Sequence, residues 1–172
     1  MRFFLLFLSL VFLYPSRTFA VHHPPIPSGK LKSPAQLKEI TWLHLDDDAL
    51  KFMSEHKMPA LVYFYDSTDS TFQFSQKIDP LLDKSKKVKK LGVFFACFEV
   101  EIGDTSIRRA SLNTKDMFTS RFPKISVPKH SSLMFLDFKG NVVEHLTEAI
   151  SEKEFIRLLQ KVRIANIKIK SM

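Results

Sequence analysis

The pattern of hydrophobic and polar positions divides most of the chain into alternating strands and helices. The continuous apolar run Ala60–Tyr65, and the segment Val93–Val100, which is apolar except for Glu99, are typical of buried strands. Shorter β-prone segments predict further strands at Ile40–Leu45, Leu133–Asp137 and Val142–Leu146. A hairpin turn over Phe138–Asn141 is predicted to join the last two of these strands.

Capping residues and apolar stripes predict helices between the strands. Asp46 can cap a helix that runs to about His56, and Thr114–Ser120 suits a short helix. A longer helix is predicted from about Phe72 to Lys87, with a kink at Pro80. Ser151 and Glu154 form a capping box for the last helix, and its apolar stripe is Phe155, Leu158, Leu159 and Val162. The order β-α-β-α-β-α-β-β-α indicates an α/β fold with a sheet of mixed direction.

The N-terminal residues lie outside this pattern. The apolar run from Phe3 to Tyr14 follows Arg2, is too short to span a bilayer, and precedes small residues at Thr18-Phe19-Ala20. We therefore expect a signal peptide over 1–20; the alternative is an uncleaved anchor. A Pro-rich extended leader over 21–39, a folded domain over 40–163 and a basic C-terminal tail over 164–172 are expected to follow.

Composition and charge narrow the class of protein. Apolar residues make up 45% of the chain, including 17 Phe, which is ample for one folded core. No other apolar stretch reaches spanning length, so the mature chain is expected to be soluble, either in the lumen of the endoplasmic reticulum or secreted. The formal charge of +8 falls to +6 if Arg2 and Arg17 are removed, because the predicted signal peptide has no acidic residue.

Basic residues cluster twice, at Lys84, Lys86, Lys87, Lys89 and Lys90, and again at Lys161, Arg163, Lys168 and Lys170. Cations at the C-terminal ends of helices interact favourably with the helix dipole, and we favour this solvated interpretation. The alternative is weak contact with anionic glycans or lipids. A nucleic-acid partner is not expected in the secretory pathway.

The single cysteine limits the redox chemistry of the chain. Dithiol–disulfide exchange needs an attacking thiolate and a resolving thiol nearby, and Cys97 cannot supply both. Cys97 lies within the apolar run Val93–Val100, where a cysteine behaves as a small hydrophobic residue. The alternative, an intermolecular disulfide, requires Cys97 to be exposed.

Two segments resemble thioredoxins. Residues Gln76–Asp83, with Pro80, resemble the kinked helix that follows the thioredoxin active site, and Gly140–Leu159 resembles the closing hairpin and helix. The resemblance covers about Ile40 to Val162. It implies a thioredoxin-like fold, in which a central mixed β-sheet is flanked by helices. It places the chain with superfamily members that lack Cys-x-x-Cys, such as redox-inactive protein disulfide isomerase-like and thioredoxin domain-containing proteins.

The parts of the exchange machinery that the resemblance locates are all replaced. Alignment on Pro80 puts Phe72 and Ser75 at the positions of the two redox cysteines. Ser131 takes the place of the family's cis-proline, and we expect a trans bond there because a non-proline cis bond costs about 3 kcal/mol. Tyr63 takes the place of the buried acid that relays protons. We therefore do not expect an oxidoreductase enzyme.

The resemblance also implies a binding groove. In the family, the loops that correspond to 66–75 and 127–131 receive a client peptide in extended form. The expected protein-binding residues are Phe72, Phe74, Ser75, Pro128, Lys129 and Ser131. In the alternative interpretation, Phe72 or Phe74 joins the core. The expected function is that of a redox-inactive chaperone or adaptor that binds secretory-pathway proteins or peptides.

Two other functions stay open. The lengthened loop after Phe64, together with Leu43–Asp46 and Val93–Ala96, resembles the lumenal domain of oligosaccharyltransferase thioredoxin-like subunits, which would imply an accessory role in N-glycosylation. Those subunits continue into membrane helices. The other alternative is an oxidoreductase that acts through a mixed disulfide at Cys97.

The predicted mature N-terminus carries one candidate metal site. Cleavage after Ala20 would begin the chain with Val21-His22-His23, whose terminal amine, two backbone amides and His23 imidazole form a square-planar nitrogen set. That geometry suits Cu(II) or Ni(II). We expect no cofactor, because the chain has only four glycines and no glycine-rich phosphate loop.

Overall fold

The computed structural model describes residues 33–66, 73–103 and 114–171 of the chain. The predicted signal peptide, His22, His23 and Phe72 lie outside these ranges. No helix within them is both long and apolar enough to cross a membrane.

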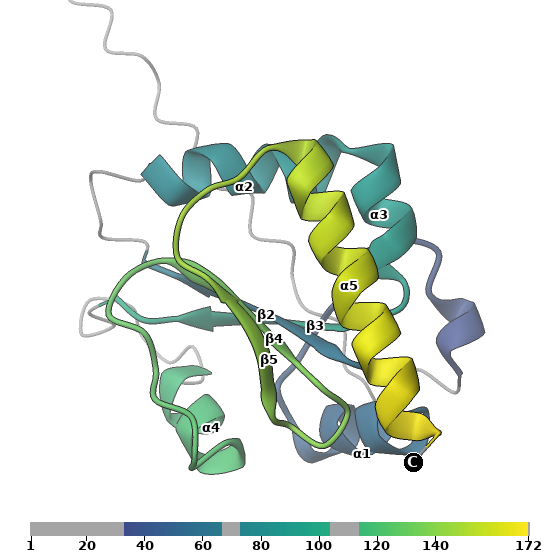
Figure 1. Ribbon diagram of the computed structural model, residues 1–172. Coiled ribbons are helices and arrows are strands. Elements are labelled where there is room, and N and C mark those ends of the chain that lie inside the picture. The colour runs from purple at the N-terminus through teal and green to yellow at the C-terminus, as the bar shows by residue number, and fades with distance from the viewer. Residues whose placement is uncertain (1–32, 67–72, 104–113, 172) are drawn as a thin grey trace, which may run out of the picture.

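A five-stranded mixed sheet forms the centre of the molecule (Figure 1). The strands are β1 (Trp42–Leu43), β2 (Ala60–Tyr65), β3 (Ala96–Glu101), β4 (Ser132–Leu136) and β5 (Val142–Leu146). Their order across the sheet is β1-β3-β2-β4-β5. The first three run parallel, β4 is antiparallel to β2, and β5 is antiparallel to β4. The predicted α/β class and mixed sheet are confirmed.

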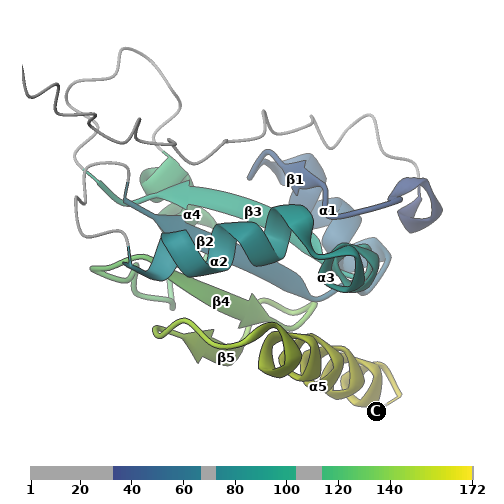
Figure 2. The same cartoon turned by 90° about the horizontal axis from the view of Figure 1, so that it is seen from above.

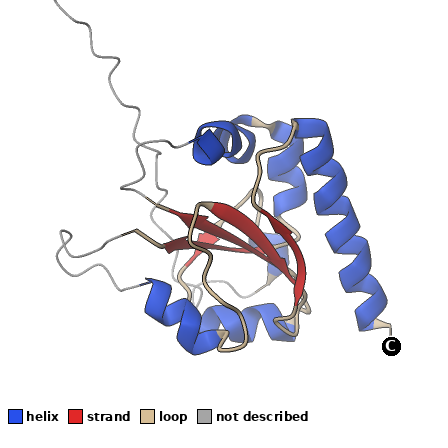
Figure 3. Ribbon diagram, turned by 60° about the vertical axis from the view of Figure 1, so that its left-hand side comes forward, coloured by secondary structure: helices blue, strands red, loops and turns tan. Residues whose placement is uncertain are grey.

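Helices cover both faces of the sheet (Figure 3). One face is covered by α1 (Asp47–Glu55) and α4 (Thr114–Arg121), and the other by α2 (Gln73–Lys84), α3 (Lys86–Gly92) and α5 (Glu152–Lys170). A short 3₁₀ helix, η2 (Pro34–Gln36), precedes β1. Side chains alternate along β2, so that Val62 and Phe64 join the first core whereas Leu61 and Tyr63 join the second.

Several predicted elements are confirmed with their capping groups. The observed bounds of β2 and β5 are those predicted from the sequence. The Asp46 carboxylate accepts a hydrogen bond from Ala49 N at 2.8 Å, which caps α1. Ser151 and Glu154 form the complete capping box of α5.

The single helix predicted from Phe72 to Lys87 is wrong, because the chain forms two helices there. The first, α2, ends at Lys84, and Ser85 becomes the N-cap of α3 by accepting a hydrogen bond from Val88 N at 3.2 Å. Pro80 lies inside α2, as expected.

The predicted bounds of three strands and the last helix also differ from those observed. Strand β4 spans Ser132–Leu136, one residue earlier than the predicted Leu133–Asp137. The strand β1 has only two residues, and β3 begins at Ala96 because Phe94 N and Phe95 N instead donate to carbonyls at the end of α3. Helix α5 continues to Lys170, through most of the segment expected to be a tail. Asn166 is buried there: its Oδ1 accepts from Phe138 N at 3.1 Å, and its Nδ2 donates to the Lys57 carbonyl at 2.9 Å.

Candidate functional site

The two segments that the resemblance assigns to a binding groove contact each other in the structure. Asp66, directly after β2, donates from its backbone N–H to Ser131 Oγ at 3.2 Å, just before β4. Ser131 and Pro128 are half-buried, whereas Lys129 is exposed. The described residues contain no cis peptide bond, so the bond before Ser131 is trans.

A buried polar cluster connects β2 to the first turns of α2. The Tyr63 hydroxyl is hydrogen-bonded to Ser75 Oγ at 2.7 Å and to Asp79 Oδ1 at 2.8 Å, where the carboxylate accepts. Tyr63 and Ser75 are both nearly inaccessible to solvent. Ser75 therefore has a defined partner beneath α2, and this partner is the residue aligned with the family's proton-relaying acid.

The environment of Tyr63 keeps its side chain protonated. Burial raises the pKa of the Tyr63 phenol well above its usual value, and the negative charge of Asp79 raises it further. The neutral phenol lies between Ser75 and Asp79, so the cluster holds the first turns of α2 against β2.

Cys97 lies in the interior of the sheet, away from any exposed loop. On β3 it is in register with Trp42 of β1 on one side and Leu61 of β2 on the other. Its side chain is fully buried in the second core, as the sequence predicts, and its Sγ is 3.7 Å from the Phe95 carbonyl oxygen. Burial raises the pKa of the Cys97 thiol, and the charge of Glu99 raises it further. The thiol is therefore neutral and inaccessible.

The other predicted binding residues have different exposures. Phe74, at the start of α2, is half-buried and packs against the second core, so part of its ring belongs to the core. Ser75 is buried and faces Tyr63. Phe72 lies outside the described residues. Among the predicted binding residues that the structure describes, Lys129, in the segment before β4, is the exposed one.

The sequence interpretation missed Asp79, although a local signal was present. Asp79 follows Ser75 by four residues, and this helical spacing places both side chains on the same face of α2. Asp66 lies in the predicted groove loop, but its hydrogen bond to Ser131 was not predicted, because a backbone N–H group carries no sequence signal. Within the described ranges, no group of three or more His, Cys, Asp or Glu residues is arranged to hold a metal ion.

Solved structures with a similar arrangement include three thioredoxin-like proteins. The structure titled "DsbH Oxidoreductase" matches with a TM-score of 0.57 and 16% sequence identity, covering 78% of this chain and 91% of that chain. A thioredoxin from Thermus thermophilus matches with a TM-score of 0.48 and 19% identity, covering 69% and 84% of the two chains. Trxlp from Edwardsiella tarda EIB202 gives a TM-score of 0.42 and 16% identity, covering 66% and 93%.

No family model and no curated protein matches the chain. The fold assignment therefore rests on strand order, on the helices that cover each face, and on the likeness to the DsbH structure. The chain has a thioredoxin-like fold whose single cysteine excludes a Cys-x-x-Cys motif.

Proposed function

We propose that this chain is a redox-inactive thioredoxin-like domain of the secretory pathway that binds proteins or peptides as a chaperone or adaptor. The observation that carries the proposal is the state of Ser75. At the position aligned with a redox cysteine, this serine is buried and hydrogen-bonded to Tyr63, while the only thiol lies inside the sheet. The secretory location is supported by the predicted signal peptide.

The proposed lack of exchange chemistry rests on the number and position of thiol groups. Reduction of a substrate disulfide requires a thiolate to attack one sulfur and a second thiol to resolve the mixed disulfide. Cys97 has no partner in the chain, and its neutral, fully buried thiol cannot reach a protein disulfide. We therefore propose that the domain has kept the fold of an oxidoreductase without its reaction.

The proposed binding surface lies beside the contact between Asp66 and Ser131. Lys129 is exposed there, Pro128 and Ser131 are half-buried, and part of the Phe74 ring remains accessible at the start of α2. A mixed surface of this kind suits an extended peptide that offers a carbonyl or carboxylate to Lys129 and an apolar side chain to Phe74.

An insulin-reduction assay tests the redox part of the proposal. The wild-type chain and a cysteine-free Cys97→Ala variant are expected to give the same slow rate as the reductant alone. A wild-type rate clearly above that of Cys97→Ala would overturn the proposal and favour the oxidoreductase that acts through a mixed disulfide.

The binding part is tested by suppression of aggregation of chemically reduced insulin chains. The wild type should delay aggregation, and Lys129→Ala and Phe74→Ser should each weaken this effect. Lys124→Ala removes an exposed lysine nearby in the sequence and serves as the matched control. Loss of activity in Lys124→Ala as well, or no delay by the wild type, would contradict this surface.

Crosslinked capture from the native cells distinguishes between kinds of partner. Diverse unfolded secretory proteins would support a chaperone, and one recurrent partner would support an adaptor. Recovery of oligosaccharyltransferase subunits would instead favour the accessory role in N-glycosylation.

A further inference from the structure

The two basic segments of the sequence meet on one surface of the fold. Helices α3 and α5 pack beside each other on the same side of the sheet (Figure 2). At their N-terminal ends, Ser85 Oγ donates to Glu152 Oε1. Just after the C-terminal end of α3, the Phe94 ring contacts the middle of α5: its centre lies 3.6 Å from the Arg163 guanidinium. The two helices therefore form one continuous surface.

This α3–α5 face is strongly cationic. We define it by Lys86, Lys87, Lys90 and Phe94 from α3 and the residues after it, and by Arg157, Arg163, Ile164, Ile167 and Lys168 from α5. Neither the segment 84–98 nor the segment 155–172 contains an acidic residue. Two neighbouring lysines outside this set are paired with carboxylates of other elements: Lys89 with Glu39 at 3.1 Å, and Lys161 with Glu144 at 2.7 Å.

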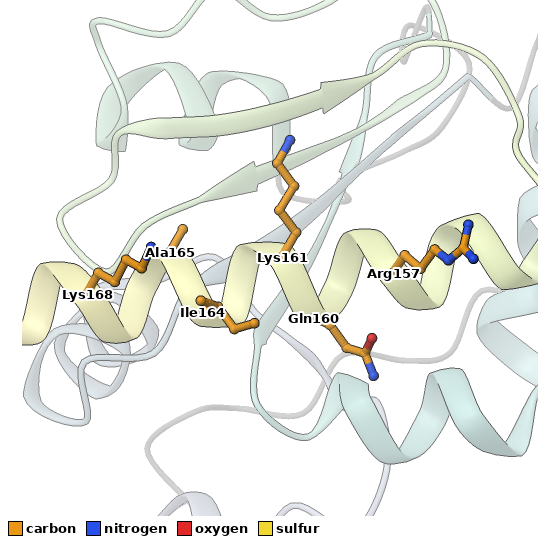
Figure 4. Close-up of a pocket in the computed structure, with 6 residues that line it drawn as sticks. All are labelled: Arg157, Gln160, Lys161, Ile164, Ala165 and Lys168. Carbon is orange, nitrogen blue, oxygen red and sulfur yellow. The ribbon is translucent and has the colours of Figure 1, made fainter.

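Large apolar side chains are exposed on the same face. Phe94 is 38% exposed, Ile164 55% and Ile167 51%, and the other large apolar side chain exposed among the described residues is Val142 on β5. Ile164 lies in an open depression on α5, with Arg157, Gln160, Lys161, Ala165 and Lys168 around it (Figure 4). Helical spacing places these residues opposite the buried stripe of Phe155, Leu159 and Val162.

A surface that mixes cations with exposed isoleucines suits the interface of a membrane. Lysine and arginine are attracted to anionic headgroups, while apolar side chains enter the boundary between headgroups and acyl chains. Helix α5 has 19 residues. It therefore presents a straight edge of about 28 Å to a flat surface. An anionic glycan would use the cations but has no apolar phase to receive Ile164 and Ile167.

We propose that the α3–α5 face binds the surface of an anionic phospholipid membrane. This binding is separate from the proposed protein-binding groove, because that groove lies at the C-terminal end of β2 and before β4. The N-terminal ends of α3 and α5 are held together by Ser85 and Glu152, so both helices present their cations to the same membrane.

Cosedimentation with vesicles tests the proposal. The purified chain is expected to bind vesicles of phosphatidylcholine mixed with phosphatidylglycerol, to bind phosphatidylcholine alone much more weakly, and to be released by salt. The variant Lys86→Gln/Lys90→Gln/Arg157→Gln/Lys168→Gln should lower the binding constant by at least about tenfold, because each cation near the surface contributes attraction. The variant Ile164→Gln/Ile167→Gln should also bind more weakly while keeping every charge.

Controls separate membrane binding by the α3–α5 face from a general effect of losing positive charge and from any binding by the N-terminal segment that all variants share. Lys115→Gln/Lys124→Gln removes two exposed lysines on or after α4, which covers the opposite face of the sheet, and should bind like the wild type. All variants share the same N-terminal segment, and circular dichroism confirms that each is folded. Equal binding to both kinds of vesicle, or equal binding by all variants, would overturn the proposal. The proposal would also be overturned if the chain bound heparin and Ile164→Gln/Ile167→Gln bound vesicles as strongly as the wild type. That result would identify a general site for polyanions.

Discussion

At the scale of single residues, the cluster of Tyr63, Ser75 and Asp79 determines how α2 sits on the sheet. Replacing Tyr63 by Phe removes the hydroxyl group, so Ser75 Oγ and Asp79 Oδ1 each lose their hydrogen bond to it. We expect Tyr63→Phe to lower the free energy of unfolding by about 1–3 kcal/mol. Urea denaturation measures the change.

A double-mutant cycle separates this hydrogen bond from general packing. Ser75→Ala removes the partner oxygen, so the loss caused by Tyr63→Phe should be smaller in the Ser75→Ala background, by about 0.5 kcal/mol or more. Strictly additive effects would show that the two hydroxyl groups do not stabilise each other.

The raised pKa of Tyr63 predicts a loss of stability in alkaline solution. Desolvation and Asp79 keep the phenol neutral in the folded chain, whereas in the unfolded chain it ionises near pH 10. Below pH 10 both states are protonated and the full stability is present; above it, only the unfolded state gains from ionisation. The free energy of unfolding should then fall by up to about 1.4 kcal/mol per pH unit from this group. Urea titrations at several alkaline pH values should show a shallower decline for Tyr63→Phe, and parallel curves would refute this origin.

The burial of Cys97 predicts that its thiol is protected from reagents. In the folded chain, Cys97 is fully buried between β1 and β2, so iodoacetamide should label it only when the sheet opens. Labelling should be slow in buffer and complete in guanidinium, as measured by intact mass. Rapid labelling of the folded chain would show that the thiol is accessible and would reopen the mixed-disulfide function.

At the scale of elements, Asn166 attaches the last helix to two distant loops. Its side chain satisfies the Phe138 N–H in the β4–β5 hairpin and the Lys57 carbonyl before β2. Asn166→Ala would leave both backbone groups without this partner, and we expect a loss of about 2–3 kcal/mol in the free energy of unfolding. Ile167→Ala, at the exposed neighbouring position, should change it by less than about 0.5 kcal/mol. Thermal denaturation measures both variants. Equal melting temperatures for Asn166→Ala and Ile167→Ala would contradict this role of Asn166.

The bounds of helices and strands could be predicted where one local sequence signal allowed a single interpretation. The apolar run of β2 and the capping box of α5 act within a few residues, and both were predicted correctly. The division between α2 and α3 was not, because Ser85 fits a helical pattern equally well as an interior residue or as an N-cap. The continuation of α5 was missed because the partners of Asn166 come from positions far away in the sequence.

At the scale of the whole molecule, tertiary contacts bring together residues whose relation no linear pattern reveals. The resemblance places Ser75 at a redox cysteine and Tyr63 at the buried acid, but it predicts no contact between them, and their hydrogen bond is visible only in the fold. Each basic segment by itself favoured a solvated helix end, with weak contact with anionic glycans or lipids as the alternative. The exposed isoleucines of α5 and the packing of α3 against it became visible only in the fold. Surfaces assembled from separate helices are therefore the least predictable feature of this chain.

The two cores of the molecule share one sheet, and this predicts that they unfold together. Phe118 of α4 lies in the first core, 5.0 Å from the Phe64 ring centre, whereas the only tryptophan, Trp42, lies in the second core. Because β2 contributes side chains to both cores, loss of packing around Phe118 should weaken the environment of Trp42 as well. Phe118→Leu should lower the free energy of unfolding by about 1 kcal/mol.

The lower stability of Phe118→Leu should be measured equally by Trp42 fluorescence and by far-ultraviolet circular dichroism, so the two urea midpoints should coincide. Lys115→Ala, at an exposed position of the same helix, is the control and should leave both midpoints unchanged. If the circular dichroism midpoint moved while that of Trp42 stayed in place, the faces of the sheet would unfold separately. The α3–α5 face could then persist after α1 and α4 had detached, so the coincidence of the two midpoints also decides whether that face depends on the whole fold.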